Sequence, residues 1–116
     1  MSRDQWTAVD EYLVEHLIPA DEVLDAALAA SAAAGLPDIQ VSPTQGRLLQ
    51  LLARIHGASS ILEIGTLGGY STICLARGMA KDGALTTLEI DPKHADVARA
   101  NFARAGLTDV IELRLG

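Results

Sequence analysis

Two stretches of the sequence combine glycines and carboxylates in a way that suits the binding of a small ligand. The first, Ser60 to Ser71, passes from an apolar run into a glycine-rich segment. This pattern predicts a buried strand that leads into a helix through a tight loop. Glycines permit positive φ and let another molecule approach the backbone closely. Because ligands of open α/β sheets bind beyond the carboxyl ends of the strands, the loop from Gly65 to Gly69 is the first candidate site.

Glu89 is the second candidate, because it ends another apolar segment 24 residues after Gly65. A carboxylate there can accept hydrogen bonds from both ribose hydroxyls of an adenosine that lies across the sheet. The same charge would repel a 2′-phosphate, which argues against NADP. Glu89 alone could be a solvated strand end, but the glycine loop at this spacing favours ribose binding.

The spacing of the glycines helps to choose among adenosine ligands. A dinucleotide-binding loop has the pattern G-x-G-x-x-G, with the pyrophosphate at the helix N-terminus. Here Leu67 replaces the second glycine, which would admit the pyrophosphate, and Glu63 stands two residues before Gly65. A carboxylate so close to the site suits a ligand with an amine. S-adenosylmethionine carries an amine and a ribose but no phosphate, so the sequence favours it over NAD.

The elements that must position these residues follow from apolar spacing and capping residues. Helices are predicted over 4–17, 21–34, 43–57, 69–80 and 91–105, and strands over 60–64, 84–90 and 110–115. Ser42-Pro43-Thr44-Gln45 is a helix start with a capping box, and Asp91-Pro92 is another cap followed by proline. A connector over 38–41 precedes the third helix.

The order β-α-β-α-β after residue 58 predicts an α/β fold with parallel strands and right-handed crossovers. We therefore expect an N-terminal helical region over 1–57 and the first half of a Rossmann-like domain over 58–116. Three parallel strands make half of a doubly wound sheet. The first strand would keep an unpaired apolar edge, so either part of the sheet is missing or another chain supplies it.

Composition narrows the classes of function. The 116 residues carry a net charge of −6 with no basic stripe, which argues against nucleic-acid binding. No apolar run approaches the roughly 20 residues that cross a bilayer, and the polar N-terminus does not resemble a secretory signal. A single cysteine, Cys74, excludes an internal disulfide and a cysteine zinc cluster. We expect a cytoplasmic protein with no membrane partner.

Several segments together resemble the cation-dependent O-methyltransferases, the group that contains catechol and caffeoyl-CoA O-methyltransferases. The segments that carry the resemblance are Glu63 to Ser71, Leu88-Glu89-Ile90-Asp91-Pro92, Gln45-Gly46-Arg47-Leu48-Leu49 and Ala105-Gly106-Leu107. The similarity covers most of 36–116 and extends more loosely to the N-terminal helices. It implies a Rossmann-like methyltransferase fold, a parallel sheet with flanking helices that is incomplete, with three strands, in this chain.

The resemblance also implies a set of cofactor-binding residues: Val41, Glu63, Gly65, Thr66, Leu67, Gly69, Ser71, Glu89, Ile90 and Gly116. Ser71 would hold the methionine carboxylate at a helix N-terminus, where an anion is favoured. Ile90 would lie against the adenine, and Gly116 would open the loop along the adenine edge. Val41, Leu67 and Ile90 could equally be core residues, and Ser71 could be only a helix cap.

By the same resemblance, the divalent metal (Mg²⁺) is held by an aspartate after the fourth strand and an Asp-Asn pair after the fifth. Those positions lie beyond residue 116, so we expect neither catalytic nor metal-binding residues in this chain. The expected function is the cofactor-binding half of an S-adenosylmethionine-dependent O-methyltransferase, a homodimer that methylates a hydroxyl of a small, aromatic acceptor. Two alternatives stay open: a non-catalytic adenosyl-cofactor-binding or assembly module and, less favoured, an NAD-binding half-domain.

The remaining residues with reactive side chains have structural interpretations. Tyr70 is expected to pack rather than catalyse, and Cys74 is expected to be a small buried hydrophobe. His16, His56 and His94 are scattered through the sequence and are interpreted as surface or boundary residues. Trp6 and Tyr12, on the first helix, would belong to dimer and acceptor-side elements by resemblance alone.

Overall fold

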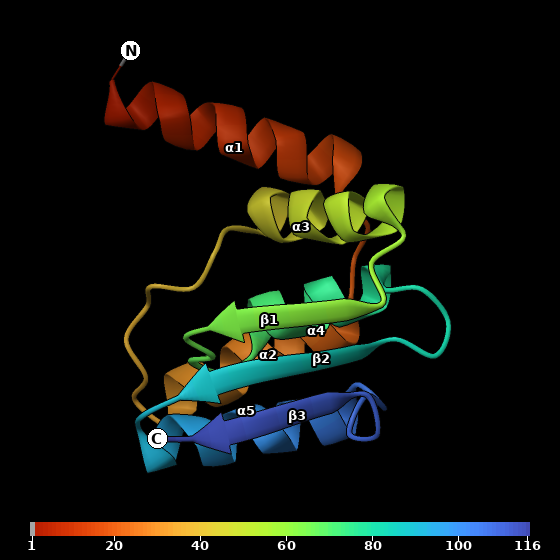
Figure 1. The fold of residues 1–116 in the computed structure, drawn as a ribbon. Coiled ribbons are helices and arrows are strands. Elements are labelled where there is room, and N and C mark those ends of the chain that lie inside the picture. Colours follow the sequence, from red (N-terminus) through yellow and green to blue (C-terminus); the bar gives the residue numbers. More distant parts are fainter. Residues whose placement is uncertain (1) are drawn as a thin grey trace.

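The computed structural model describes residues 2–116, and its elements alternate as the sequence predicts (Figure 1). In chain order they are α1 (Arg3–Leu17), α2 (Glu22–Ala33), α3 (Pro43–His56), β1 (Ser60–Ile64), α4 (Tyr70–Gly78), β2 (Ala84–Glu89), α5 (Pro92–Arg104) and β3 (Ile111–Leu115). Every predicted helix and strand is present. The largest difference in a boundary is at α4, which ends two residues earlier than expected.

Local capping fixes where the helices around the site begin. The Ser42 hydroxyl accepts a hydrogen bond from the Gln45 N–H, and the Gln45 side chain accepts one from the Ser42 N–H, so the predicted capping box is confirmed. Asp91 accepts from the N–H groups of Lys93 and His94 at the start of α5. These two caps define the residues at which α3 and α5 begin.

The three strands form a parallel sheet in the order β1-β2-β3. In this register Ile64 pairs with Leu88, and Glu89 pairs with Leu115. Because the strands are parallel, β1 and β2 end at the same edge of the sheet, which brings the glycine loop next to Glu89. The predicted parallel, three-stranded α/β architecture is confirmed.

Helices α4 and α5 cover one face of the sheet, and α2 lies on that same side (Figure 1). The core between them is apolar and includes Ile73 of α4, Leu85 of β2 and Phe102 of α5. Helix α3 packs along α4, and α2 packs against α5. The N-terminal helices therefore contribute to the same packed body as the sheet, and the division of the chain at residue 57 stays a prediction.

The other face of the sheet is not covered by any helix of residues 2–116. Leu62 is 64% exposed and Ile64 is 81% exposed, while the Ile61 and Glu63 side chains, which alternate with them, point toward the helices. The prediction that β1 is a buried strand is therefore wrong for these two residues. An apolar run indicates burial on both faces, but the described chain supplies cover for only one. The outer edge of β1 likewise has no strand beside it in this part of the chain.

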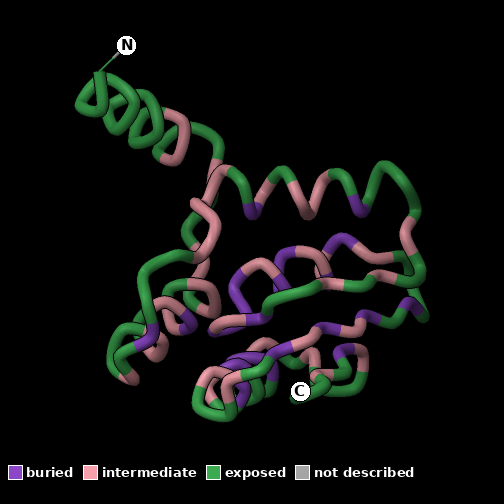
Figure 2. The backbone as a smooth tube through the Cα atoms, turned by 60° about the vertical axis from the view of Figure 1, so that its left-hand side comes forward, coloured by how far each residue is buried: buried purple, intermediate pink, exposed green. Residues whose placement is uncertain are grey.

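Helix α1 is the most exposed element of the fold, as Figure 2 shows. It has the predicted amphipathic pattern, yet none of its residues is buried, and Trp6, Tyr12 and Leu17 all face solvent over more than half of their surface. Buried residues gather instead in α4, α5 and β2 (Figure 2). No helix of residues 2–116 is long and apolar enough to span a membrane.

Candidate functional site

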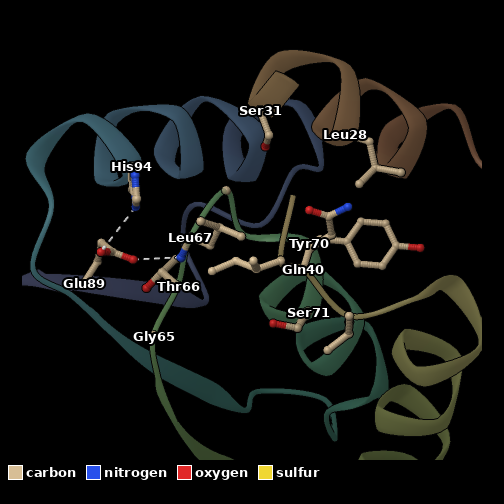
Figure 3. A pocket seen from close by; sticks show the side chains of 13 residues that line it. Leu28, Ser31, Gln40, Gly65, Thr66, Leu67, Tyr70, Ser71, Glu89 and His94 are labelled. Atoms are coloured by element: carbon tan, nitrogen blue, oxygen red, sulfur yellow. Dashed lines mark hydrogen bonds and ion pairs between the residues drawn. The ribbon is translucent and has the colours of Figure 1, made fainter. Parts of the chain in front are cut away.

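A cavity of about 320 Å³ lies where β1 and β2 end, at the position predicted from the glycine loop (Figure 3). Its walls come from α2, from the connector before α3, from the β1–α4 loop, from the start of α4 and from the β2–α5 junction. The lining residues are Leu28, Ser31, Ile39, Gln40, Val41, Gly65, Thr66, Leu67, Gly68, Tyr70, Ser71, Glu89 and His94. The side chains of Glu89 and His94 are at one end, and Tyr70 and Ser71 are at the other (Figure 3).

The β1–α4 loop owes its shape to backbone conformations that favour glycine. Gly65 and Gly69 have φ of 94° and 90°, and Leu67 has a φ of 55°. A Cβ on Gly65 would meet nothing within 4 Å, so this glycine serves the turn and leaves its surroundings open. A Cβ on Gly69 would lie 2.5 Å from the ring of Phe102. Gly69 thus lets the loop sit directly on α5.

Two further contacts hold the loop between helices. The side-chain amide of Asn101, which is fully buried in α5, donates a hydrogen bond of 2.7 Å to the carbonyl oxygen of Gly68. A Cβ on Gly68 would lie 2.1 Å from the hydroxyl oxygen of Ser31 in α2. Sequence reasoning missed Asn101, because a polar residue on a helix gives no sign that tertiary packing will bury it.

Glu89 is an anchored, buried carboxylate. It is 8% exposed, its Oε1 accepts a hydrogen bond of 2.7 Å from the Leu67 N–H, and its Oε2 accepts from the N–H groups of Ile90 and Asp91, both at 3.1 Å. Burial raises its pKa, but the N–H groups of Asp91 and Leu67 and the nearby His94 outweigh burial, so the pKa lies below the usual value. The solvated strand end considered above is therefore wrong.

His94 stands beside this carboxylate and faces the same cavity (Figure 3). Its Nδ1 lies 3.7 Å from Glu89 Oε2, and its Nε2 lies 3.4 Å from Asp91 Oδ2. With a side-chain exposure of 21%, it is a boundary residue in the sense predicted. Its place in the site could not be predicted, however, since the turn that follows Glu89 decides where the first turn of α5 points.

The opposite end of the cavity is the N-terminus of α4. The first turn of a helix has N–H groups without helical partners, and no side chain caps this one, whose N-cap is Gly69. Tyr70 and Ser71, the first two residues of the helix, line the cavity. The partial positive charge of a helix N-terminus favours an anion at this end.

A buried network of hydroxyl groups lies behind the loop and centres on Glu63. Its Oε2 accepts a hydrogen bond of 2.6 Å from Ser71, and its Oε1 accepts from Thr72 and, at 2.8 Å, from Thr87. The Thr87 hydroxyl is in turn 2.6 Å from that of Thr66. Glu63 thus connects the start of α4, through Ser71 and Thr72, to β2, through Thr87. Ser71 donates its hydroxyl hydrogen to Glu63, so the backbone N–H groups are the donors that α4 offers to the cavity.

The structure brings together six of the ten predicted site residues at the cavity: Val41, Gly65, Thr66, Leu67, Ser71 and Glu89. The other four are not among the residues that line this cavity. Glu63 is behind the wall, Gly69 packs on Phe102, Ile90 is 82% exposed, and Gly116 donates its N–H to the carbonyl oxygen of Glu89. A direct role of these four in ligand binding stays a prediction.

Seven lining residues are not among the ten predicted cofactor-binding residues: Leu28, Ser31, Ile39, Gln40, Gly68, Tyr70 and His94. Gly68 and Tyr70 belong to the glycine-rich motif that located the loop, so their position in that motif could have identified them as site residues. Leu28 and Ser31 reach the cavity only because α2 packs against α5. No feature of the sequence around α2 predicts the packing of α2 against α5.

Tyr70 and Cys74 are packing residues, as predicted. A Cβ on Gly46 of α3 would lie 3.0 Å from the Tyr70 ring and 2.9 Å from the Cys74 sulfur, which shows how closely α3 and α4 approach. Burial raises the pKa of the Tyr70 hydroxyl to about 12 and that of the Cys74 thiol to about 11. Both groups are therefore protonated at neutral pH.

Residues 2–116 contain no group of three or more His, Cys, Asp or Glu side chains that could hold a metal ion. The residues present in this part of the chain therefore do not fit the divalent cation that the resemblance implies.

Comparison with known proteins agrees with the geometry of the site. The chain matches the O-methyltransferase family model over residues 15–116. It is 51% identical, over all of its own length and 52% of the relative, to a catechol O-methyltransferase of Niastella koreensis.

Two solved structures extend this comparison to the fold. An O-methyltransferase from Bacillus cereus in complex with SAH is 57% identical, with a TM-score of 0.96 over 97% of this chain and 51% of that one. The O-methyltransferase TomG from Streptomyces achromogenes, in complex with SAM, is 44% identical, with a TM-score of 0.93 over 100% of this chain and 52% of that one. The chain thus spans about half the length of these relatives, and it belongs to the O-methyltransferase family.

Proposed function

We propose that this chain forms the cofactor-binding half of an O-methyltransferase that uses S-adenosylmethionine. The complete protein would transfer the methyl group to a hydroxyl of a small, aromatic acceptor. The observation that carries the proposal is the arrangement of the cavity, which has an anchored carboxylate at one end and an uncapped helix N-terminus at the other. The relatives named as catechol O-methyltransferases support the class of acceptor.

The two ends of the cavity match two polar parts of this ligand, the ribose and the methionine carboxylate. Glu89 can accept a hydrogen bond from a ribose hydroxyl, because backbone N–H groups hold its carboxylate in one orientation. The N–H groups of Tyr70 and Ser71 can bind the methionine carboxylate. Leu67 occupies the position at which a dinucleotide-binding loop has glycine, which disfavours a pyrophosphate. S-adenosylhomocysteine and S-adenosylmethionine share both of these polar parts.

The protein's own contribution to the reaction would be binding and orientation. When bound, S-adenosylmethionine supplies an electrophilic methyl group on a sulfonium. Glu89 and the start of α4 would fix the two ends of the ligand, so that the sulfonium lies between them with the methyl group held in one direction. Positioning of this kind lowers the entropic cost of an in-line attack by the acceptor oxygen. The connector residues Ile39 and Gln40 would limit access of water from the side.

A non-catalytic cofactor-binding module is the second candidate. It requires only the cavity and the residues that line it. Such a module would bind the cofactor with the same residues and would not transfer its methyl group.

Calorimetric titration tests the binding part of the proposal. We expect the protein to bind S-adenosylhomocysteine with one site per chain and more tightly than NAD. Tighter binding of NAD would favour a dinucleotide half-domain instead. Isotope-labelled methyl transfer from S-adenosylmethionine to a catechol in the presence of Mg²⁺, measured with the full-length gene product, then separates the enzyme from the module. Transfer supports the enzyme, and binding without transfer supports the module.

We further infer that the complete protein is a cytoplasmic homodimer. The exposed Trp6, Tyr12 and Leu17 on α1 offer an apolar surface for a second copy. The free thiol of Cys74 fits a reducing compartment. Light scattering coupled to size-exclusion chromatography tests the dimer, and substitution of Trp6 by Glu should shift the protein to the mass of a monomer.

A further inference from the structure

Most of the hydrogen-bond acceptor positions of the Glu89 carboxylate are occupied by N–H groups of the protein itself. An ionised carboxylate offers about four acceptor positions. The N–H groups of Ile90 and Asp91 occupy both positions of Oε2, and the Leu67 N–H occupies one of Oε1. A single unstrained position is left, on Oε1. The ribose of an adenosine ligand has two neighbouring hydroxyls, so one of them needs a different partner.

His94 offers a polar side chain at the same end of the cavity as Glu89 (Figure 3). Its Nδ1 is 3.7 Å from Glu89 Oε2, which is longer than a hydrogen bond, so this nitrogen is not bonded to Glu89. Both residues line the cavity. Nδ1 is therefore available to a polar group of a ligand that enters this end of the cavity.

The other side of the imidazole ring faces Asp91. Nε2 lies 3.4 Å from Oδ2 of Asp91, whose Oδ1 accepts a hydrogen bond from the Lys93 N–H as the cap of α5. The helix cap thus fixes Asp91 beside the ring, and the side chain of His94 is only 21% exposed. A side chain confined in this way loses little conformational entropy when a ligand binds. A hydroxyl can either donate to a neutral Nδ1 or accept from a protonated one, so this contact does not require one charge state.

We propose that His94 is a second binding residue for the vicinal diol of the nucleoside: one hydroxyl donates to Glu89 Oε1, and the other bonds to His94 Nδ1. The inference rests on the proposed function, because it requires a ribose at this end of the cavity. It adds a residue that binds the ligand directly, whereas a purely structural role would limit His94 to its contacts with Asp91 and Glu89.

A cycle of variants and ligands tests the contact. S-adenosylhomocysteine and its 2′-deoxy and 3′-deoxy analogues are titrated by calorimetry into the wild-type protein, His94→Ala, His94→Asn and Glu89→Gln. We expect His94→Ala to weaken binding of S-adenosylhomocysteine about five-fold. Binding of one deoxy analogue, which lacks the hydroxyl that His94 contacts, should stay almost unchanged. His94→Asn keeps a polar atom near the position of Nδ1 and should recover part of the loss.

Control variants separate this contact from general damage to the fold. His16→Ala changes a histidine on α1 that bonds to the Tyr12 carbonyl oxygen and stacks on the Tyr12 ring, so it should alter no affinity. Equal weakening of all three ligands by His94→Ala, or no weakening of any, would overturn the role of His94 while wild-type binding still supports the proposed function. Failure of the folded wild-type protein to bind S-adenosylhomocysteine would overturn both.

Discussion

The two faces of the sheet differ in how completely they are built. On the face toward α4 and α5, Leu85 and Thr87 are fully buried, and the carboxyl ends of the strands carry the cavity. On the opposite face, Leu62 and Ile64 stand in solvent. The exposed apolar surface continues beside β1, where an apolar groove of about 450 Å³ runs along α3 and contains Leu52 and Ile55.

This difference shows that the cavity and the exposed face of the sheet depend on separate parts of the molecule. The Glu63 and Asn101 side chains, which support the walls of the cavity, have hydrogen-bond partners within residues 2–116. The outer face and the edge of β1 have none there, and exposed apolar edges of this kind favour association with another strand. Changes on the covered face should therefore reduce stability and ligand binding, and changes on the open face should mainly affect self-association.

The largest expected difference comes from one leucine on each face. Leu85→Ala should lower the free energy of unfolding by about 3 kcal/mol, because it leaves a cavity in the core. Leu62→Ala should change it by less than about 0.5 kcal/mol, because this leucine is already hydrated. Urea denaturation of both variants measures the two values. Equal losses would show that the two faces are equally packed and would break the comparison.

Two glycines with positive φ, one packed against the core and one in open space, allow a second comparison between covered and open parts of the molecule. Gly69→Ala should destabilise the protein by about 2–3 kcal/mol, because it combines a φ of 90° with a Cβ pressed against Phe102. Gly57→Ala also has positive φ, at 63°, but meets nothing within 4 Å, so about 1 kcal/mol is expected. Thermal unfolding followed by circular dichroism compares the two. A larger loss at Gly57 would contradict the packing of the loop on α5.

Removal of one charge tests the acidic end of the cavity. Glu89→Gln should weaken binding of S-adenosylhomocysteine about 30-fold, because it weakens a charge-assisted hydrogen bond and disturbs the three N–H groups that hold the carboxylate. Glu112→Gln is the matched control, since this glutamate is exposed on β3 and pairs with Arg114. Calorimetry should give wild-type affinity for the control. Similar losses in both variants would point to net charge as the cause.

The smallest effect is a dependence on pH. Since the pKa of Glu89 is lowered in the folded protein, its contribution to stability is fully present above the unfolded value of about 4.5 and is lost as the pH falls through the folded value. The difference in unfolding free energy between wild type and Glu89→Gln should therefore be constant from pH 6 to 8 and shrink below about pH 4.5. A difference that grows on acidification would contradict the anchoring of the carboxylate.

The sequence predicted those parts of the fold that depend on neighbours along the chain. Caps such as Ser42 and Asp91, the strand ends at Gly65 and Glu89, and the parallel order all follow from local patterns. His94 and Asn101 could not be placed, because their partners are brought to them by packing across the fold. The exposure of Leu62 and Ile64 could not be predicted either, since an apolar strand carries no information on whether a covering layer is present.

The central claim is that Glu89 and the start of α4 form the two ends of one nucleoside-binding cavity. Calorimetric titration of S-adenosylhomocysteine into the wild-type protein, Glu89→Gln and Glu112→Gln tests it most directly. We predict one site per chain in the wild type, the same affinity in Glu112→Gln and a marked loss in Glu89→Gln. A folded wild-type protein that does not bind S-adenosylhomocysteine, or a Glu89→Gln variant that binds it equally well, would contradict the account.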